Sequence, residues 1–357
     1  EEPKSSEAYG LGLQVAFDTA DGIAIGFGSE PSDLSQAGVE RALDKARRGA
    51  VHDPEFVSLP KPGPERRALR GYHDPALLDI GDAQLVEAGW KVLGGALGAF
   101  LASSRLAGLA GGDAGLRRLG FIVGGDVTIL QERMAIASTH LREAQTDEST
   151  LMMGFVTAMV EAYDAKGSGW STGIRLDHFT DGAGVEAAQN AIAAIDGERV
   201  PAGDYTVVFG KQPVADILNN LVIPACHAGA FYSGSTPFLG QLGKPVASPR
   251  LSVYDSGAVP GLMGSKGITC EGLPTGRTDL IRNGELVGLL TSWYDGQRLL
   301  RDPALREKLG VDGAAAAPAL VARNGFRYAG GGGRAFDVQP GVAASNVIVE
   351  GADHLPL

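Results

Sequence analysis

The feature of this sequence that most constrains its fold is its glycine content. The 357-residue chain contains 52 glycines, about twice the usual share of roughly 7%, and they follow no collagen-like triplet period. They stand singly or in short clusters between apolar stretches. Because glycine is the residue that tight turns and close backbone approaches accept best, this distribution predicts a globular fold with many turns.

Charge and cysteine content narrow the functional classes. The chain has 31 basic and 42 acidic residues, a net charge of −11 and a pI of about 5.1, which disfavours nucleic-acid binding because phosphate backbones are bound mainly by basic residues. No apolar run reaches the ~18 residues that a membrane span needs, so no membrane partner is expected. Cys226 and Cys270 form no CxxC pair, which fits a reducing compartment. We therefore expect a cytoplasmic protein.

The ends and the middle of the chain suggest its organisation. The opening residues EEPKSSEAYG lack both an initiating methionine and an apolar signal-peptide core, so we expect the natural chain to begin earlier and both ends to be truncated. Gly197 and Pro201 close the last helical pattern of the first half. The expected division is an N-terminal and central α/β region over residues 1–200 and a β-rich domain over residues 201–357.

Apolar spacing gives the expected elements of the first region. Alternation predicts strands and a 3–4 residue spacing predicts helices. The predicted elements are a strand over 13–17, an Asp21-Gly22 turn, a strand over 23–27, a helix over 34–46 capped by Ser32 or Asp33, a Gly/Ala-rich helix over 82–109, strands over 121–123 and 127–130 around a Gly124-Gly125 turn, an apolar run over 151–160, a polar turn over 166–170 and a helix over 185–195.

The second region reads as a glycine-rich mixed β domain with few helices. An alternating strand at Tyr205, Val207 and Phe209 is followed by the helix-like segment PVADILNNLVIP. Asn283-Gly284 is a strong hairpin signal. The further predicted strands cover residues 251–254, 278–281, 286–290 and 345–350.

The residues that could carry chemistry form no strong constellation. None of the six histidines belongs to an HxxxH or HExxH pair, the spacing that places two imidazoles on one helix face for zinc. Cys226, His227 and Cys270 are a conceivable zinc trio, but two buried cysteines and a loop histidine are the preferred interpretation. His178 beside Asp177 is interpreted as a loop histidine, because no serine lies in a GxSxG context.

Three further polar segments have plain structural interpretations. GGGGR at 330–334 lacks the lysine and the helix start of a phosphate-binding loop, so we expect a flexible loop. The acidic residues of DAQLVE and TDEST are expected on the solvated surface. Glu271-Gly272 lies in ITCEGLPTGR, where glycines and Pro274 constrain a polar turn between strands.

An ordered series of residues in the second half resembles the C-terminal domain of the TldD/PmbA family, whose second member is also called TldE. The similar segments are YTVVFGKQPVADIL, STPFLGQLGKPVASPRLSVYDSG and GSKGITCEGLPTGRTDLIRNGELVGLL. The matching positions are Ser235, Phe238, Leu242, Gly243, Val246, Asp255, Glu271, Gly272, Leu280, Ile281, Gly284 and Leu286. Weaker similarity extends to the opening strands and to SNVIVEG.

The resemblance implies an α+β fold in two parts, an α/β N-terminal half and a mixed β C-terminal half. It also implies dimers, in which a TldD-type subunit carries zinc on an HExxxH helix and cleaves unfolded or modified peptides. The TldE/PmbA-type partner lacks that motif. In this sequence the corresponding helix reads PVADILNNL, with Ala215, Asp216 and Asn219 or Asn220 near the ligand positions. Alanine cannot bind zinc and asparagine is a poor substitute for imidazole.

The sequence is therefore interpreted as a non-catalytic TldE/PmbA-like subunit of a zinc metallopeptidase complex, with no metal in this chain and zinc in a TldD-like partner. The peptide-channel candidates are Ser235, Phe238, Glu271 and Arg277, in or beside the loops 226–237 and 267–276. Two alternatives stay open. One is a diverged metallopeptidase with a metal site rebuilt at Cys226, His227 and Cys270. The other is a stand-alone homodimer that binds extended peptides.

Overall fold

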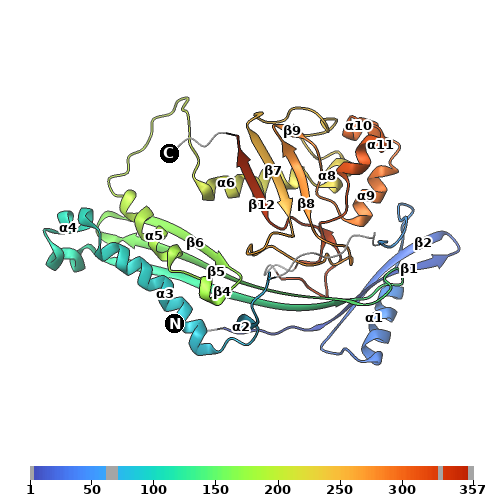
Figure 1. Cartoon of the computed structure of the whole chain (residues 1–357), viewed down its shortest axis with the longest axis horizontal. Helices are drawn as coiled ribbons and strands as arrows, with labels where there is room; N and C mark the ends of the chain where they lie inside the picture. The colour runs from blue at the N-terminus through green and yellow to red at the C-terminus, as the bar shows by residue number, and fades with distance from the viewer. Residues whose placement is uncertain (1–3, 62–70, 329–332, 353–357) are drawn as a thin grey trace.

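A long antiparallel hairpin is the spine of the structure, a computed structural model that describes residues 4–61, 71–328 and 333–352 (Figure 1). Its strands β4 (Phe121–Ile136) and β5 (Gln145–Val160) are 16 residues each and pair along their whole length. A third strand, β6 (Ala165–Gly173), pairs antiparallel with the second half of β5. Helices cover one end of this sheet, and the C-terminal domain covers the other (Figure 1).

Two predictions for this sheet are wrong, and glycine is the reason in both cases. Gly124 and Gly125 form no turn but lie inside β4. A Cβ atom at Gly125 would stand 2.0 Å from the carbonyl oxygen of Phe155, so glycine permits a close backbone approach here. The polar turn predicted over 166–170 is likewise part of β6. Glycines that lie inside long strands were therefore mistaken for turn residues.

Two Gly/Ala-rich helices pack over one end of the sheet. α3 (Asp82–Leu101) and α5 (Gly182–Ala193) run side by side, and α5 contacts β5 and β6. The two helix backbones approach closely at Gly184, where a Cβ atom would stand only 1.9 Å from the carbonyl oxygen of Val92. Phe100, Met152 and Phe179 are fully buried in the core between helices and sheet. The predicted helices over 82–109 and 185–195 are thus confirmed, the first with a break.

That break separates α3 from α4 (Ser104–Ala110), whose N-cap Ser103 accepts a hydrogen bond from the backbone N–H of Leu106. No single helix in the described ranges is long and apolar enough to cross a membrane. By length and composition alone, α3 and α4 together would be, but a 59° bend separates them. The short helices around them are α2 (Pro75–Leu78), η1 (Asp113–Leu119), η2 (Glu161–Tyr163) and η3 (Leu176–His178).

The N-terminal module is a hairpin with one helix on it. Its elements are β1 (Gly10–Thr19), β2 (Gly22–Pro31), α1 (Gln36–Arg48) and β3 (Val51–His52). The predicted strands, turn and helix are confirmed. The predicted cap is wrong: the N-cap is Ser35, whose hydroxyl accepts from the N–H of Gly38, while Asp33 accepts from the N–H of Ser35.

The C-terminal domain is built around a four-stranded sheet in the order β12-β7-β8-β9. The hairpin predicted at Asn283-Gly284 is confirmed, and both residues have positive φ, 48° and 81°, as a two-residue hairpin turn requires. The strands are β7 (Leu251–Ser256), β8 (Arg277–Arg282), β9 (Glu285–Leu286) and β12 (Val347–Gly351), with a separate pair β10 (Gly325–Phe326) and β11 (Gly341–Val342).

Helices are more numerous in this domain than predicted. They are α6 (Lys211–Ile217), a π-helical turn η4 (Leu218–Val222), α7 (Ile223–Ala225), α8 (Ala228–Ser233), α9 (Trp293–Leu300), α10 (Leu305–Leu309), α11 (Gly313–Ala316) and η5 (Ala317–Ala319). Phe231, Leu280 and Leu299 lie in a second core between these helices and the sheet. The helix predicted in PVADILNNLVIP is confirmed.

The strand predicted at Tyr205, Val207 and Phe209 is wrong. This segment belongs to no strand, and the three side chains are all more than half exposed. In Figure 1 it belongs to the excursion that leads from α5 to α6. Alternation alone predicted a half-buried strand here, but the segment has no neighbouring strand in the described chain to complete a sheet.

A buried cluster of charges joins the long hairpin to the C-terminal domain. Arg334 donates to Glu132 (Nε to Oε1, 2.9 Å) and to Asp147 (Nη1 to Oδ2, 2.7 Å), and the ammonium of Lys266 lies 3.2 Å from Glu132 and 2.9 Å from the hydroxyl of Ser149. We call these five residues the Arg334 cluster. Burial of Asp147 shows that the surface position predicted for TDEST is wrong at this residue.

Of the loop predicted at 330–334, residues 330–332 lie outside the described ranges, but Arg334 is inside them and its side chain is only 2% exposed.

Candidate functional site

A polar hollow of about 350 Å³ lies beside α8 and α9 in the C-terminal domain. We call it the His227 pocket. Its lining comes from the end of α7, from α8 and the loop after it, from α9 and from β11: Pro224, His227, Gly229, Ala230, Ser233, Ser235, Asp295, Arg298 and Val342. Two residues singled out from the sequence, His227 and Ser235, therefore meet here.

Main-chain pairing positions His227. The N–H of Ala228 donates to the carbonyl oxygen of Leu290 (2.9 Å), and the N–H of Leu290 donates to the carbonyl oxygen of Cys226 (3.0 Å). Because these bonds tie the start of α8 to the segment that leads into α9, the two helices face each other across the pocket. Ser292 caps α9 by accepting from the N–H of Asp295 (3.1 Å).

Arg298 is the charged centre of the pocket wall. Its Nη2 lies 2.8 Å from Asp295, its Nη1 lies 3.6 Å from Glu55, and its guanidinium stands 4.2 Å from the ring centroid of Tyr232. The hydroxyl of Tyr232 in turn donates to Glu55. One guanidinium is thus held between two carboxylates, and the loop that carries Glu55 joins the N-terminal module to the site.

Burial favours the neutral form of the His227 imidazole. Burial lowers its pKa from the ordinary 6.5, and the nearby carboxylate of Asp295 opposes that shift only in part. Its Nε2 atom is buried and has no hydrogen-bond partner among the described residues. Two hydroxyls complete the polar lining, because the Oγ atoms of Ser233 and Ser235 are hydrogen-bonded at 2.9 Å.

Glu271 supports this site from behind rather than lining it. Both of its carboxylate oxygens accept from the N–H of Trp293, at 3.1 and 3.0 Å, at the N-terminus of α9. Burial raises the pKa of Glu271 to about 7, although the N–H of Trp293 favours the charged form. A Cβ atom at Gly325 would stand 1.9 Å from Glu271 Oε2, so glycine makes room for the carboxylate.

The other predicted channel residues lie elsewhere. Phe238 is half-buried and packs against the second core. Arg277 lies on β8, where its guanidinium stands 3.5 Å from the ring centroid of Tyr254 and pairs with Asp279. Neither residue lines the His227 pocket.

The conceivable zinc trio is not assembled. Cys226 is buried in the second core, and burial raises the pKa of its thiol to about 12, whereas Cys270 faces Met134 of β4 at 3.9 Å between sulfur atoms. Within residues 4–61, 71–328 and 333–352, no group of three or more His, Cys, Asp or Glu side chains could hold a metal ion.

The helix that the sequence resemblance led us to expect at the position of a zinc helix does not fit zinc either. α6 and η4 present Asp216 as their one carboxylate, which accepts from the side-chain amide of Gln212 (3.1 Å). Asn220 donates to the main-chain oxygen of Asp216 (2.8 Å). Zinc sites use thiolates, imidazoles and several carboxylates, and a single carboxylate with amides is not such a donor set.

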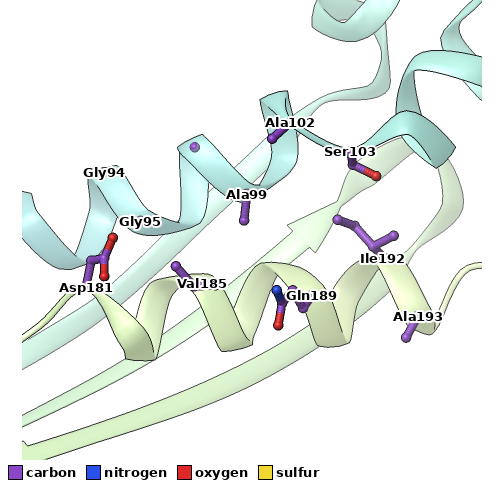
Figure 2. A pocket seen from close by; sticks show the side chains of 11 residues that line it. Gly94, Gly95, Ala99, Ala102, Ser103, Asp181, Val185, Gln189, Ile192 and Ala193 are labelled. Atoms are coloured by element: carbon purple, nitrogen blue, oxygen red, sulfur yellow. The ribbon is translucent and has the colours of Figure 1, made fainter.

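A second, larger hollow of about 630 Å³ runs between α3 and α5 (Figure 2). Small and apolar side chains dominate its lining, with Gly94, Gly95 and Ala99 on α3 facing Val185 and Ile192 on α5 (Figure 2). Asp181 is the one charged residue in its lining, whereas His227, Asp295 and Arg298 converge on the His227 pocket, so the smaller hollow is the better candidate for a functional site.

Sequence reasoning missed three of the charged residues at the site, Glu55, Asp295 and Arg298. The signal for two of them was present in SWYDGQRLL: Ser292 and Asp295 have the spacing of a helix N-cap, and Asp295 and Arg298 have the i,i+3 spacing of a helical ion pair. No local pattern marked Glu55, because its partners are far away in the sequence.

Comparison with known proteins agrees with the sequence resemblance. Residues 202–356 match the family model described as the PmbA/TldA metallopeptidase C-terminal domain. The chain is 34% identical over 130 residues to metalloprotease slr0863 of Synechocystis, covering 36% of this chain and 27% of that protein. It is 30% identical over 105 residues to the metalloprotease TldD homolog of Haemophilus influenzae, covering 29% of this chain and 22% of that protein. The aligned part of this chain thus covers about a quarter of the length of each relative.

The fold extends the likeness beyond the matched sequence. The crystal structure of TldE from Thermococcus kodakarensis superposes with a TM-score of 0.59 and 17% identity, covering 96% of this chain and 72% of that one. The predicted α+β fold is confirmed. The C-terminal domain is thus similar in sequence to the TldD/PmbA metallopeptidases, and nearly the whole described chain shares the fold of TldE from Thermococcus kodakarensis.

Proposed function

We propose that this chain is the non-catalytic, TldE/PmbA-like subunit of a zinc metallopeptidase complex that processes unfolded or modified peptides. The observation that carries the proposal is the donor set of α6 and η4, where Ala215, Asp216, Asn219 and Asn220 offer one carboxylate and no imidazole. Without ligands for a metal, this helix cannot activate water in the way a zinc peptidase does. The zinc would then be in a TldD-like partner.

The role of this subunit is to hold the peptide. The His227 pocket offers neutral hydrogen-bonding groups and lies in the loop region 226–237. β12 forms one edge of the C-terminal sheet, and an exposed edge can bind an extended chain by main-chain hydrogen bonds with little demand on sequence. That mode suits substrates that have lost their fold. Both cysteines are free and buried, in keeping with a protein that works in a reducing compartment such as the cytoplasm.

Reconstitution tests this function. The chain is to be mixed with a TldD-like zinc peptidase from the same organism and an unfolded protein substrate. We expect cleavage by the mixture at a rate at least tenfold above that of either component. Cleavage by this chain alone, abolished by Cys270→Ala, would instead support the rebuilt metal site; a metal-free homodimer that leaves the peptidase unaffected would support the stand-alone peptide-binding protein.

Glu271 provides a sharper test of the same function. Replacement by alanine removes the acceptor for the N–H of Trp293 and loosens the helix that presents Asp295 and Arg298. We expect Glu271→Ala to lower peptide processing by the reconstituted complex about tenfold without preventing assembly. Glu285→Ala, an exposed glutamate on β9, is the matched control. Unchanged processing by Glu271→Ala would contradict this role.

A further inference from the structure

The segment between α5 and α6 exposes large apolar side chains more densely than any other part of the described chain. Within residues 200–221, seven such side chains are exposed: Val200, Tyr205, Val207, Val208, Phe209, Ile217 and Leu221. In Figure 1 the segment runs in a loop that stands away from the sheets. Single exposed apolar residues are common on folded proteins, but a contiguous exposed apolar stretch marks an interaction site.

The main chain in the middle of this segment is free to pair. None of residues 204–209 forms a main-chain hydrogen bond with another described residue, and none has a positive φ. Both ends are held. The hydroxyl of Tyr205 donates to the carbonyl oxygen of Pro201 (2.9 Å), and Nζ of Lys211 lies 2.9 Å from Glu186 of α5. A tethered segment with unpaired N–H and C=O groups is a template for pairing with another chain.

The side chains of this segment suit a strand. Tyr205, Val207 and Phe209 alternate with Thr206 and Val208, and aromatic and β-branched residues are those that strands prefer. In a strand the first three would share one face. What the described chain lacks is a neighbouring strand, so a second chain has to supply it.

The order of charges around the segment favours a second copy of this chain as that partner. Asp204 precedes the apolar residues and Lys211 follows them. In an antiparallel pair of two copies, Asp204 of each copy lies beside the end that carries Lys211 of the other, whereas a parallel pair would bring like charges together. Opposite charges across two strands stabilise their pairing, and like charges oppose it.

The apolar side chains are complementary in the same arrangement. Centred on Val207, antiparallel pairing places this valine opposite Val207 of the second copy. Tyr205 then lies opposite Phe209, so that one face of the two-stranded ribbon is continuously apolar. The same surface is used by both copies, as a two-fold axis requires.

The paired segment is short, and this limits its strength. A stable specific interface buries about 1,200–2,000 Å², which five residues from each copy do not reach. We therefore expect self-association with a dissociation constant of about 10–100 µM.

We propose that residues 205–209 of two copies of this chain pair as antiparallel strands about a two-fold axis at Val207. The contact goes beyond the proposed function, because it joins two copies of this chain and leaves assembly with a TldD-like peptidase to other surfaces. In the complex with that peptidase it would bring two heterodimers together at high concentration, whereas single heterodimers are expected on dilution.

Exchange of the central valine for charged residues tests the proposal. The full chain is studied by sedimentation equilibrium from about 5 to 500 µM. Val207→Asp places two carboxylates opposite each other at the axis, and Val207→Lys places two ammonium groups there. Each variant alone should associate at least about tenfold more weakly than the wild type. A mixture of the two variants sets a carboxylate opposite an ammonium group, and it should associate at least about fivefold more tightly than either variant alone.

An exposed valine elsewhere provides the matched control. Val51 on β3 is 70% exposed, and Val51→Asp should leave the dissociation constant unchanged. Thermal unfolding of each variant, followed by circular dichroism, should match the wild type, because the replaced side chain of Val207 is 59% exposed.

Three results would overturn the proposal. One is a wild-type chain that stays monomeric up to about 500 µM. Another is self-association that Val207→Asp does not weaken, or that the mixture of charged variants does not restore, since the contact would then lie elsewhere. The last is a wild-type chain that is monomeric alone but loses assembly with a TldD-like peptidase on Val207→Asp substitution, which would assign the segment to that partner.

Discussion

The two polar clusters of this protein differ in how completely their groups are paired. In the Arg334 cluster, each carboxylate accepts from at least two groups, and even the main-chain N–H of Gly267 donates to Asp147 (3.0 Å). In the His227 pocket an imidazole nitrogen and a guanidinium nitrogen are buried without partners among the described residues, whereas in the Arg334 cluster this holds for one atom, Nη2 of Arg334.

The positions of the clusters explain the difference. The Arg334 cluster lies where the long hairpin meets the C-terminal domain, and its side chains are almost inaccessible. The His227 pocket is open, between two helices of one domain. A closed cluster whose carboxylates are saturated fixes two parts of a fold relative to each other, whereas polar groups that line an open hollow can meet a ligand. Substitutions in the first should therefore change stability, and substitutions in the second should change binding.

The largest effect is expected from breaking the Arg334 cluster. Arg334→Met leaves Glu132 and Asp147 buried with too few cationic partners, and removing one partner of a buried pair typically costs about 3–5 kcal/mol. We expect a loss of this size in the free energy of unfolding measured with urea. Arg282→Met, at a side chain that is 59% exposed, should change it by less than about 0.5 kcal/mol. Equal effects of the two variants would contradict the comparison.

The loss of folding stability at low pH should depend on the same cluster. Burial alone would raise the pKa of Glu132, but Arg334 and Lys266 outweigh it and the pKa is lowered below the ordinary 4.5. A lowered pKa in the folded state stabilises the protein above the unfolded pKa, and that stability is lost as the pH falls through the folded value. Wild-type stability should thus drop below about pH 4.5. In Arg334→Met the free energy of unfolding should depend less on pH in this range. An unchanged pH dependence would contradict the role given to Glu132 and Arg334.

The opposite pH dependence is expected next to the His227 pocket. Burial raises the pKa of Glu271 to about 7, so the stability that it contributes is fully present below about pH 4.5 and is lost as the pH rises through 7. Glu271→Gln, which stays neutral, should flatten the curve between these values and gain about 1–3 kcal/mol at pH 8 relative to the wild type. Parallel curves for the two proteins from pH 5 to 8 would show that Glu271 does not titrate in this window.

The smallest change in stability is expected within the pocket itself. His227→Leu replaces an imidazole whose Nε2 has no partner with an apolar side chain, so no hydrogen bond from that atom is lost. The free energy of unfolding should stay within about 1 kcal/mol of the wild type. A loss above about 3 kcal/mol in thermal or urea unfolding would mean that His227 has a structural role like that of Arg334.

The same contrast shows what sequence patterns can predict. Local signals predicted the N-terminal hairpin, the Gly/Ala-rich helix and the Asn283-Gly284 turn, because each depends on residues close together in the chain. The family resemblance led to Ser235 and Glu271, and the search for zinc ligands singled out His227. The partners of Asp147 and Glu55 could not be predicted, because these contacts join segments at least 75 residues apart in the sequence. The acidic run TDEST looked like surface for that reason.

Glycine caused the other errors. Gly124-Gly125 and the segment 166–170 have the composition of turns, yet both lie in strands. At Gly125, Gly167 and Gly169 the neighbouring backbone is too close for a side chain. Tyr205 to Phe209 has the alternation of a strand but no partner strand in the described chain. Periodicity predicts what a segment can form; the neighbours decide what it does form.

Native mass spectrometry of the protein purified from its own host, without chelator, tests the central claim most directly. The account predicts a heterodimer of this chain with a TldD-like peptidase, with one zinc ion that stays with the partner when the complex is dissociated. Zinc bound to this chain alone, and lost on Cys270→Ala substitution, would contradict it.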